Sequence, residues 1–234
     1  MDDAERLARL AERAAAEIED GMVLGLGSGT TTEAVIRALG RRVAAGLRVT
    51  GVPTSGRTER LARELGIPLR TLDEVERIDL GIDGADEIDP ALNVTKGRGG
   101  ALLYEKLVAL ACDRYLIVAA SEKLVEQLGT RMPLPVEVIP LGWKHTAARL
   151  AAIGCPGTLR CKPDGAVFTS DGGHVILDCQ PGPLSDPAAI ATAIKATTGV
   201  VEHGLFVGLV DQALVADRDG TIRLLERTSA RSPR

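Results

Sequence analysis

Aromatic residues are scarce in this chain, and their scarcity limits what its core and its surface can do. The 234 residues include one Trp, two Tyr and two Phe, so aromatic residues make up only 2% of the sequence. The core must therefore be aliphatic and rich in alanine. The chain also lacks basic runs and stacking platforms, and its formal net charge is −4, so we expect no nucleic acid as a partner.

Long apolar runs are missing as well. No stretch approaches the roughly 20 apolar residues that a membrane-spanning helix needs. The N-terminal segment, MDDAERLARLAERAAAEIED, is charged and amphipathic and lacks the apolar centre of a secretory signal. We therefore expect no association with a membrane and a cytoplasmic location.

Cysteine and histidine are few and scattered. The four cysteines have no C-x-x-C spacing and no neighbouring histidines, which predicts reduced, structural thiols and no metal site. The three histidines share no spacing, so none is assigned to catalysis or to a metal. With 45% hydrophobic and 26% charged residues, the chain has the composition of a globular protein with one large domain, or one medium and one small.

Strands and helices alternate over the first half of the chain. Apolar spacing predicts helices over residues 2–20, 33–39, 57–65 and 101–112, and strands over 22–26, 47–52, 67–72, 78–82 and 115–119. Short apolar strands that alternate with helices are typical of a parallel sheet covered by helices on both faces.

The pattern changes near Gly129. A linker over 130–135 precedes a predicted strand over 136–141, a helix over 145–153, short strands near 159, 167 and 175–177, and a helix over 188–197. The strand-like segment 204–225, with an Asp219-Gly220 hairpin turn, returns to the first domain, and 228–234 is predicted to be a frayed tail. We therefore predict a Rossmann-like α/β domain over 1–130 and 206–234 and a smaller α+β, ferredoxin-like domain over 131–205.

A glycine-rich segment, GLGSGTTT (25–32), follows the first predicted strand. Its G-x-G-x-G spacing does not fit a dinucleotide fingerprint, and no Gly-Lys-Ser/Thr of a P-loop follows. Backbone N–H groups and hydroxyls at the start of a helix can bind an anion without a metal. The alternative is a plain helix cap with glycines for tight packing; we favour a phosphate or carboxylate site.

Charged residues interrupt the stretch 78–106. Asp83 and Asp86 follow a buried strand, Lys96 precedes a glycine turn, and Glu105 lies early in the next helix. Ligands of open α/β sheets bind beyond the carboxyl ends of the strands. A carboxylate base, a nearby cation and turn N–H groups suit proton abstraction next to a carbonyl. The alternatives are a solvated loop or a Mg²⁺ site; Lys96 argues against the metal because it already supplies positive charge.

Two further positions follow predicted strands. Thr54 and Ser55 either touch a ligand or cap the next helix. Lys123 is predicted to begin a helix at the same edge of the sheet and, taken alone, is more typical of a surface lysine.

These segments, in this order, resemble type A ribose-5-phosphate isomerase across nearly the whole chain. The matching pieces are GLGSGTT (25–31), GVPTS (51–55), DGADEID (83–89), KGRGGA (96–101), the YEK around Glu105, SEK (121–123), PLPVEV (133–138) and HGLF (203–206). DGADEI followed at this spacing by K-G-x-G-G-A is highly specific. The resemblance implies a Rossmann-like domain with a small α+β domain, no metal or other cofactor, and a homodimer or homotetramer.

The resemblance also implies interconversion of ribose 5-phosphate and ribulose 5-phosphate through an enediolate. By motif, Glu105 matches the base that moves a proton between C1 and C2, Asp83 an acid/base for ring opening, and Asp86 a substrate-positioning carboxylate. Lys96 and the backbone of residues 97–99 match the elements that hold the oxygens of the intermediate. The substrate-binding positions that the resemblance implies are Ser28, Gly29, Thr30, Thr31, Gly84, Ala85, Gly97, Arg98, Gly99 and Lys123.

The chain departs from the family pattern at three places. Residues 27–31 read GSGTT where G-T-G-S-T is common, and Arg98 replaces a frequent glycine or apolar residue. Many relatives have a phosphate-binding lysine early in the first helix; the matching place here is near Leu7, where only Arg6 or Arg9 could substitute.

Other functions stay open from the sequence. A sugar-phosphate deaminase or an acyl-CoA transferase of the same superfamily is the enzymatic alternative, and a non-catalytic sugar-phosphate sensor is the alternative from another class. The DGADEI–KGRGGA pair favours the isomerase. Sensors need an attached DNA-binding domain, for which we expect no room ahead of the first helix.

Overall fold

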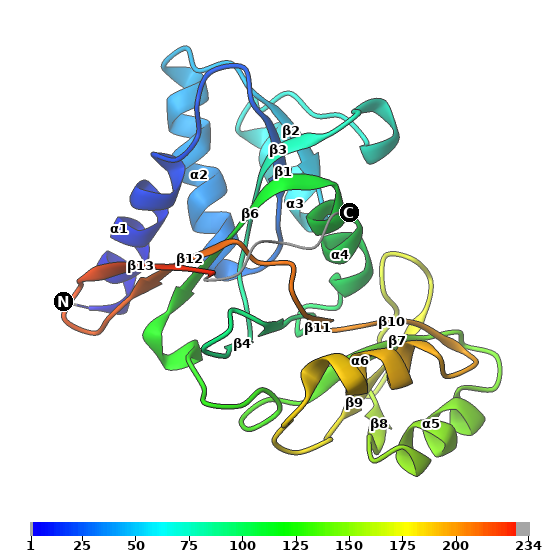
Figure 1. Ribbon diagram of the computed structural model, residues 1–234. Helices are drawn as coiled ribbons and strands as arrows, with labels where there is room; N and C mark the ends of the chain where they lie inside the picture. The colour runs from blue at the N-terminus through cyan, green and yellow to red at the C-terminus, as the bar shows by residue number, and fades with distance from the viewer. Residues whose placement is uncertain (1, 228–234) are drawn as a thin grey trace. The chain divides into compact units, whose positions relative to one another are not determined.

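The structure, a computed structural model, describes residues 2–227 and divides into two compact units. The first unit comprises the chain up to Ala85, Tyr104–Leu124 and the chain from Gly208 onward. The second unit comprises Asp86–Leu103 and Val125–Val207. Figure 1 labels most of the helices and strands of both. The predicted frayed tail, 228–234, lies outside the described residues.

A six-stranded sheet forms the centre of the first unit. Its order is β13-β12-β6-β3-β1-β2, and neighbouring strands are parallel except for the antiparallel hairpin of β12 and β13. The predicted parallel sheet and the return of the C-terminal hairpin to it are thus confirmed. The strands are β1 Val23–Leu26, β2 Thr50–Pro53, β3 Ile78–Asp83, β6 Cys112–Ala120, β12 Gln212–Ala216 and β13 Ile222–Glu226.

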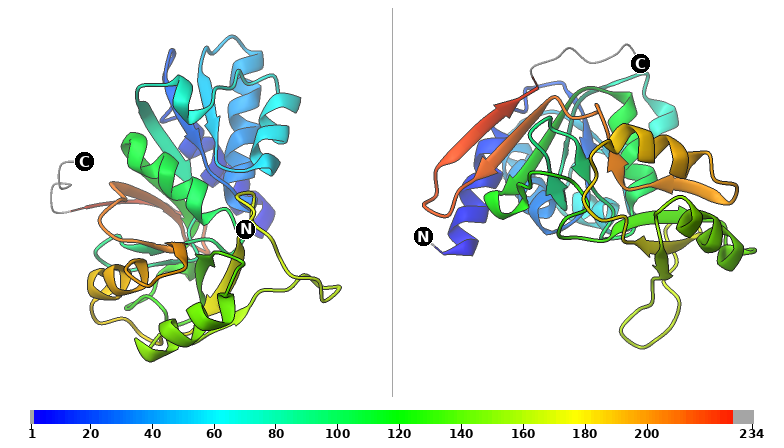
Figure 2. Two further views of the ribbon diagram at one scale, coloured as in Figure 1. Left: turned by 90° about the vertical axis from the view of Figure 1, so that its right-hand side faces the viewer. Right: turned by 60° about the horizontal axis from the view of Figure 1, so that its bottom comes forward.

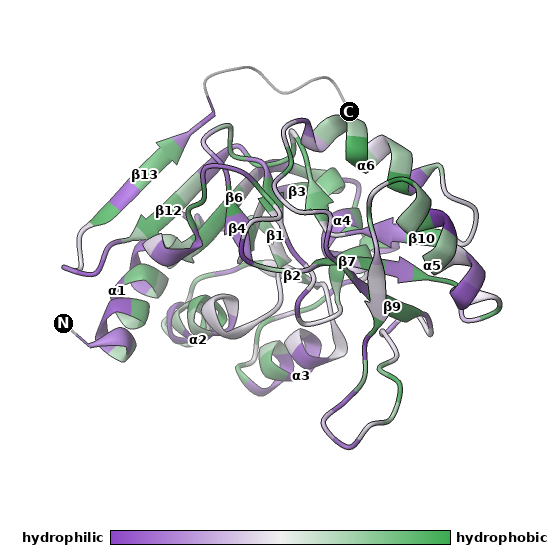
Figure 3. Cartoon of the chain, turned by 90° about the horizontal axis from the view of Figure 1, so that it is seen from below, coloured by the Kyte–Doolittle hydropathy of each residue, from purple (hydrophilic) through white to green (hydrophobic). Residues whose placement is uncertain are grey.

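Helices flank this sheet and enclose an aliphatic core, as the lack of aromatic residues predicts. They are α1 Asp3–Ala15, α2 Thr30–Ala44, α3 Gly56–Glu64 and α4 Leu102–Ala111. Hydrophilic and hydrophobic positions alternate along α1 in Figure 3, and its buried face includes Leu10 and Ala14. The helix ends earlier than predicted; beyond it, Glu17 pairs with Arg114 and Asp20 with Arg48. Within residues 2–227, every helix is too short or too polar to cross a bilayer.

The predicted strand over 67–72 is wrong. This stretch forms only an isolated parallel bridge between Leu69 and Gly51, and then the 3₁₀ helix η1, Leu72–Glu74. Pro68 has no N–H to donate, so a regular ladder cannot run through this stretch. The helix predicted to begin at Lys123 is also wrong, because Lys123 ends a short 3₁₀ helix, η2 Ser121–Lys123.

An antiparallel sheet with the order β10-β7-β9-β8 forms the core of the second unit. Along the chain its elements run strand–helix–strand–strand–helix–strand, which is the ferredoxin-like arrangement that the sequence predicts. Figure 2 shows a long loop between β8 and β9, where the strand expected near Val167 is only an isolated bridge to Cys161. The elements are β7 Leu134–Val138, α5 Trp143–Ala152, β8 Gly157–Leu159, β9 Val175–Cys179, α6 Pro187–Lys195 and β10 Val200–His203.

Residues 86–103, predicted within the first domain, group with the second unit. Two short strands from this segment, β4 Glu87–Ile88 and β5 Val94–Thr95, form a small antiparallel sheet with β11 Leu205–Phe206. The buried Glu87 carboxylate accepts the N–H groups of Gly129 and Arg131, each at 2.6 Å. These contacts are made between segments far apart in the sequence, which explains why the linear pattern did not predict them.

Candidate functional site

The carboxyl ends of four parallel strands meet at one edge of the first unit's sheet. Asp83 ends β3, Ser28 follows β1, Thr54 follows β2, and Lys123 follows β6. β3 pairs with both β1 and β6, and β1 pairs with β2. The sheet therefore places the predicted site segments of the first unit along a single edge.

Asp83 is held rigidly at this edge. Its carboxylate is 1% exposed, and Oδ1 accepts the N–H groups of Ser28 at 3.1 Å and Gly84 at 2.7 Å. The approach requires glycine at position 27, where a Cβ would lie 2.2 Å from the Asp83 Cγ. The glycine-rich segment thus serves, in part, to let the Asp83 carboxylate pack against the backbone.

Tyr115 and Glu105 lie near Asp83. The Tyr115 hydroxyl donates to Asp83 Oδ2 at 3.0 Å. Burial first, and then the nearby carboxylates of Asp83 and Glu105, raise the pKa of Tyr115 well above its ordinary value, so the phenol keeps its proton and remains a donor. Glu105, 4% exposed, lies in the first turn of α4, where the helix dipole favours a carboxylate.

Tyr115 contacts the predicted catalytic residue Asp83, but the sequence did not single it out. A tyrosine within a buried strand is ordinarily a core residue, and Asp83 is 32 positions away in the chain. Only the register of β3 against β6 brings the two side chains together.

Replacing Tyr115 with phenylalanine is expected to lower kcat/KM about tenfold, because a hydrogen bond to a charged group is worth roughly 1.5 kcal/mol. The ring and its packing stay, and only the donor to Asp83 is lost. Steady-state kinetics on the sugar phosphate that the resemblance implies would measure the effect, with Tyr104→Phe on the exposed side of α4 as the control. Equal kcat/KM for Tyr115→Phe and wild type would show that this hydrogen bond does not assist Asp83.

The hydroxyl groups beyond β1 and β2 form one cluster. Ser28 Oγ lies 2.9 Å from Thr54 Oγ1 and donates to Ser55 Oγ at 2.7 Å. Ser55 Oγ accepts the Thr58 N–H at 3.1 Å and so caps α3. Of the two alternatives for Ser55, the structure therefore bears out the helix cap.

The N-terminus of α2 has the geometry of an anion site. Gly29 adopts a φ of 102°, and the first intrahelical hydrogen bond is Glu33 N–H to Gly29 O at 2.9 Å. The N–H groups of Thr30 and Thr31 precede that bond and lie where helices bind anions.

Arg6 is tied to the segment that carries Lys123. Its Nη1 donates to both carboxylate oxygens of Glu122 at 3.0 Å, and Arg218 Nε donates to the same group. The hydrogen bond from Arg6 is the main reason that the pKa of Glu122 is lowered. Of the two arginines near the position of the early lysine, Arg6 therefore contacts Glu122, the residue before Lys123, whereas Arg9 is exposed.

Lys96, in the second unit, is buried against the HGLF segment. It is 3% exposed, its N–H donates to Gly204 O at 2.8 Å, and its Nζ lies 5.8 Å from the centroid of the Phe206 ring. A Cβ at position 204 would lie 2.1 Å from the Lys96 carbonyl oxygen. The glycine of HGLF is thus needed for this contact.

The glycine turn after Lys96 is linked to Asp86. The Arg98 N–H donates to Asp86 Oδ2 at 3.1 Å, and the Gly100 N–H closes the turn on Gly97 O at 2.9 Å. Within the second unit, the structure therefore brings together Asp86 and the predicted turn. Arg98 uses its N–H for this contact, which leaves Gly99 as the exposed donor of the turn.

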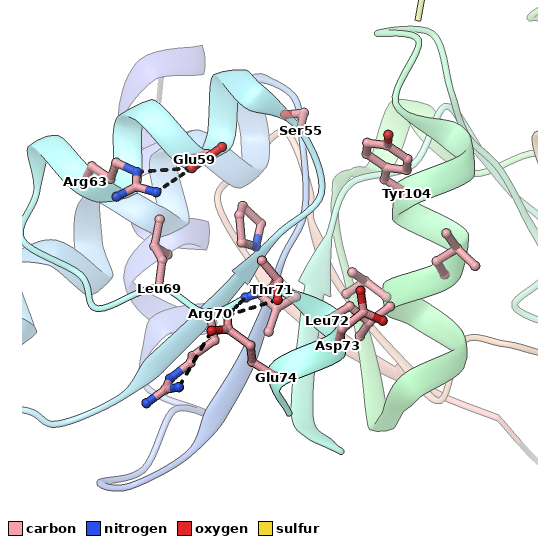
Figure 4. Close-up of a pocket in the computed structure, with 14 residues that line it drawn as sticks. Ser55, Glu59, Arg63, Leu69, Arg70, Thr71, Leu72, Asp73, Glu74 and Tyr104 are labelled. Atoms are coloured by element: carbon pink, nitrogen blue, oxygen red, sulfur yellow. Dashed lines mark hydrogen bonds and ion pairs between the residues drawn. The ribbon is translucent and has the colours of Figure 1, made fainter. Parts of the chain in front are cut away.

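A cavity of about 450 Å³ lies within the first unit, away from the predicted catalytic residues. Figure 4 shows it between α3 and α4, with Ser55 and Tyr104 on its two sides. None of the predicted catalytic residues lines it. Among residues 2–227, no group of three or more His, Cys, Asp or Glu side chains has the arrangement of a metal site.

Comparison with known proteins places the chain in a family. The family model of ribose 5-phosphate isomerase A (phosphoriboisomerase A) matches residues 50–220. Ribose-5-phosphate isomerase A of Thermomicrobium roseum is 52% identical over 221 residues, covering 94% of this chain and 93% of that protein. The protein of the same name from Roseiflexus castenholzii is 51% identical over 226 residues, covering 96% and 97%.

Solved structures agree with this assignment. A D-ribose-5-phosphate isomerase in complex with phospho-erythronic acid superposes with a TM-score of 0.93 at 37% identity, covering 97% of this chain and all of that one. Ribose 5-phosphate isomerase from Plasmodium falciparum gives 0.92 at 37% identity, covering 96% and 99%. With the sequence motifs, the fold and these relatives in agreement, the chain belongs to the ribose 5-phosphate isomerase A family.

Proposed function

We infer that this protein interconverts D-ribose 5-phosphate and D-ribulose 5-phosphate, an aldose–ketose isomerisation of the pentose phosphate pathway. The observation that carries the inference is the buried carboxylate Asp83, held by loop N–H groups and Tyr115 with Glu105 nearby, in a chain of this family. Two buried carboxylates that both raise the pKa of the same tyrosine suit a reaction that moves several protons.

Glu105 is assigned as the base. In open-chain ribose 5-phosphate, the C2 proton is acidic because the C1 carbonyl is adjacent. Glu105 takes this proton, the C–H electron pair forms the C1–C2 double bond, and O1 gains the negative charge. The same carboxyl group then returns the proton to C1 as O2 becomes the ketone oxygen. Asp83 is assigned the proton transfers of ring opening and of the hydroxyl groups.

The remaining residues are assigned to holding the substrate. Lys96 and the backbone of residues 97–99, through the exposed Gly99 N–H, stabilise the charged oxygens of the enediolate. Asp86, which accepts the Arg98 N–H, positions the sugar. The other substrate contacts are assigned to residues at the carboxyl edge of the sheet. The N-terminus of α2, whose geometry suits an anion, supports this assignment. These contacts are assigned to Ser28, Gly29, Thr30, Thr31, Gly84, Ala85 and Lys123.

Free ribose is expected to be a far poorer substrate than ribose 5-phosphate. Binding energy from the phosphate helps to position the reacting end of the sugar, so its loss lowers kcat/KM and not only affinity. Ketopentose formation from both sugars under the same conditions tests the proposed function and the phosphate site together. Comparable kcat/KM values for ribose and ribose 5-phosphate would refute the phosphate site, and no turnover of ribose 5-phosphate would refute the function.

The isomerisation is expected to need no divalent metal, because Lys96 and backbone N–H groups supply the positive charge that the enediolate requires. After exhaustive EDTA treatment, the rate should stay close to that of untreated enzyme. Loss of activity that Mg²⁺ or Mn²⁺ restores would overturn the role assigned to Lys96.

We also propose a cytoplasmic location and a homodimeric or homotetrameric assembly. All four cysteines are free thiols, which suits a reducing compartment. Three large apolar side chains on α4, Tyr104, Leu107 and Leu110, are exposed, as is common for surfaces that pair with another chain. Light scattering of the purified protein would determine the assembly.

A further inference from the structure

A single arginine of the second unit holds the carbonyl groups of the 97–100 turn. Arg160 Nη1 donates to Gly97 O at 3.0 Å and to Arg98 O at 2.9 Å. Arg160 directly follows β8, and only 13% of its side chain is exposed. One guanidinium nitrogen thus restrains two consecutive peptide carbonyls of the turn.

Asp178 and Phe168 fix the guanidinium itself. Arg160 Nε donates to Asp178 Oδ2 at 2.9 Å and Nη2 donates to Oδ1, which makes the pair bidentate. The guanidinium carbon lies 5.7 Å from the centroid of the Phe168 ring. The same ring packs on the turn, since a Cβ at position 100 would lie 2.4 Å from its Cε1.

Because the peptide bond is planar, the contacts that hold these carbonyl groups also fix the directions of the N–H groups that follow them. In a planar trans peptide, the carbonyl of one residue and the N–H of the next point in opposite directions. With Gly97 O held toward Arg160, the Arg98 N–H points away and donates to Asp86 Oδ2. With Arg98 O held toward Arg160, the Gly99 N–H must point away as well.

The Gly99 N–H is left as the donor that a ligand can reach. Gly99 is exposed, and a Cβ there would have no atom within 4 Å. Among residues 2–227, no acceptor is bound to its N–H.

We propose that Arg160, fixed by Asp178 and Phe168, is a positioning residue that orients the Gly99 N–H toward an oxygen of the enediolate and the Arg98 N–H toward Asp86. The proposal rests on the proposed function, in which this turn holds the oxygens of the intermediate. The positive charge on the carbonyl side also polarises the two peptides and strengthens their N–H groups as donors. Because such donors act mainly on charge that develops in the transition state, Arg160 contributes to kcat more than to KM.

The test is the steady-state kinetics of Arg160→Met and Arg160→Lys on ribose 5-phosphate. Arg160→Met keeps most of the stem but none of the donors, and is expected to lower kcat about 10–100-fold while KM changes less than about threefold. Arg160→Lys keeps the charge but cannot bridge both carbonyls and Asp178. Its kcat should therefore lie between those of Arg160→Met and the wild type. Arg149→Met is the matched control, because Arg149 in α5 also donates to a backbone carbonyl, Thr198 O at 2.9 Å, but does not touch the turn.

Two further measurements separate positioning from a loss of stability. Guanidinium ion at low concentration should restore part of the kcat of Arg160→Ala and leave that of Arg149→Ala unchanged. Asp178→Asn, which loosens Arg160, should lower kcat in the wild-type background and add little to Arg160→Met, since both act through one group.

The outcomes are distinct. The positioning role is overturned if the wild type is active and both Arg160→Met and Arg160→Lys fold and keep a kcat within about threefold of wild type, a difference below 1 kcal/mol. Equal losses of kcat in Arg149→Met and Arg160→Met, without guanidinium rescue, also overturn it. Such losses would show that both substitutions act by destabilising the second unit. A wild type with no isomerase activity instead refutes the proposed function. If Arg160→Met does not fold, Arg160→Lys and the guanidinium rescue decide the question.

Discussion

Glu105→Gln is expected to lower kcat about 10²–10⁴-fold, or roughly 3–5 kcal/mol, with KM similar to that of wild type. Glutamine keeps the shape and the hydrogen-bonding reach of the buried side chain but cannot accept the C2 proton. A general base matters most while the proton is moving, so its loss affects the transition state more than substrate binding. If the wild type exchanges the substrate C2 proton with D₂O, Glu105→Gln should lose this exchange to the same extent as it loses kcat.

Steady-state kinetics after a check of folding would measure this effect. Glu59→Gln is the control, because Glu59 is a carboxylate of the first unit that pairs with Arg63 on the surface of α3. A kcat of Glu105→Gln within about threefold of wild type, an effect below 1 kcal/mol, would show that Glu105 is not the base.

Gly27→Ala is expected to lower kcat/KM on the order of 100-fold, although it adds a single methyl group. The new Cβ would lie 2.2 Å from both Cγ and Oδ1 of Asp83, so the carboxylate must move. A shift of about 1 Å separates Asp83 from the Ser28 N–H and the Tyr115 hydroxyl and misplaces its proton transfers. Overpacking of this kind also costs about 1–3 kcal/mol of folding free energy.

Gly56→Ala is the control for this substitution. Gly56 begins α3 in the same unit, and a Cβ there would meet only the flexible end of Arg60, at 3.6 Å. Kinetics and thermal unfolding of both variants separate the two effects. If Gly27→Ala folds and keeps wild-type kcat/KM, the close approach of residue 27 to Asp83 has no catalytic role.

The parts of the fold that the sequence predicts depend on local patterns. The apolar runs around Leu24, Leu80 and Ile117 become strands of the sheet, and Asp83 lies at the end of its strand, as the sequence predicts. The stretch 67–72 also carries spaced apolar residues, but Pro68 interrupts it and it forms only an isolated bridge, so a prediction from apolar spacing alone gives one strand too many here.

The parts that were missed depend on contacts between distant segments. Tyr115 reaches Asp83 only through the pairing of β3 with β6. Arg160 reaches the 97–100 turn across more than 60 positions of the chain, and no spacing in the sequence connects them. Glu87 stands beside the predicted catalytic acids in DGADEI, yet its carboxylate binds the backbone of residues 129–132, a role that its neighbours do not indicate.

The most direct test of the central claim is the conversion of ribose 5-phosphate to ribulose 5-phosphate by the purified, EDTA-treated protein. The protein should produce the same equilibrium mixture from either sugar phosphate, at a rate proportional to its concentration. Folded protein that converts neither sugar phosphate would contradict the assignment of the isomerase reaction to this chain.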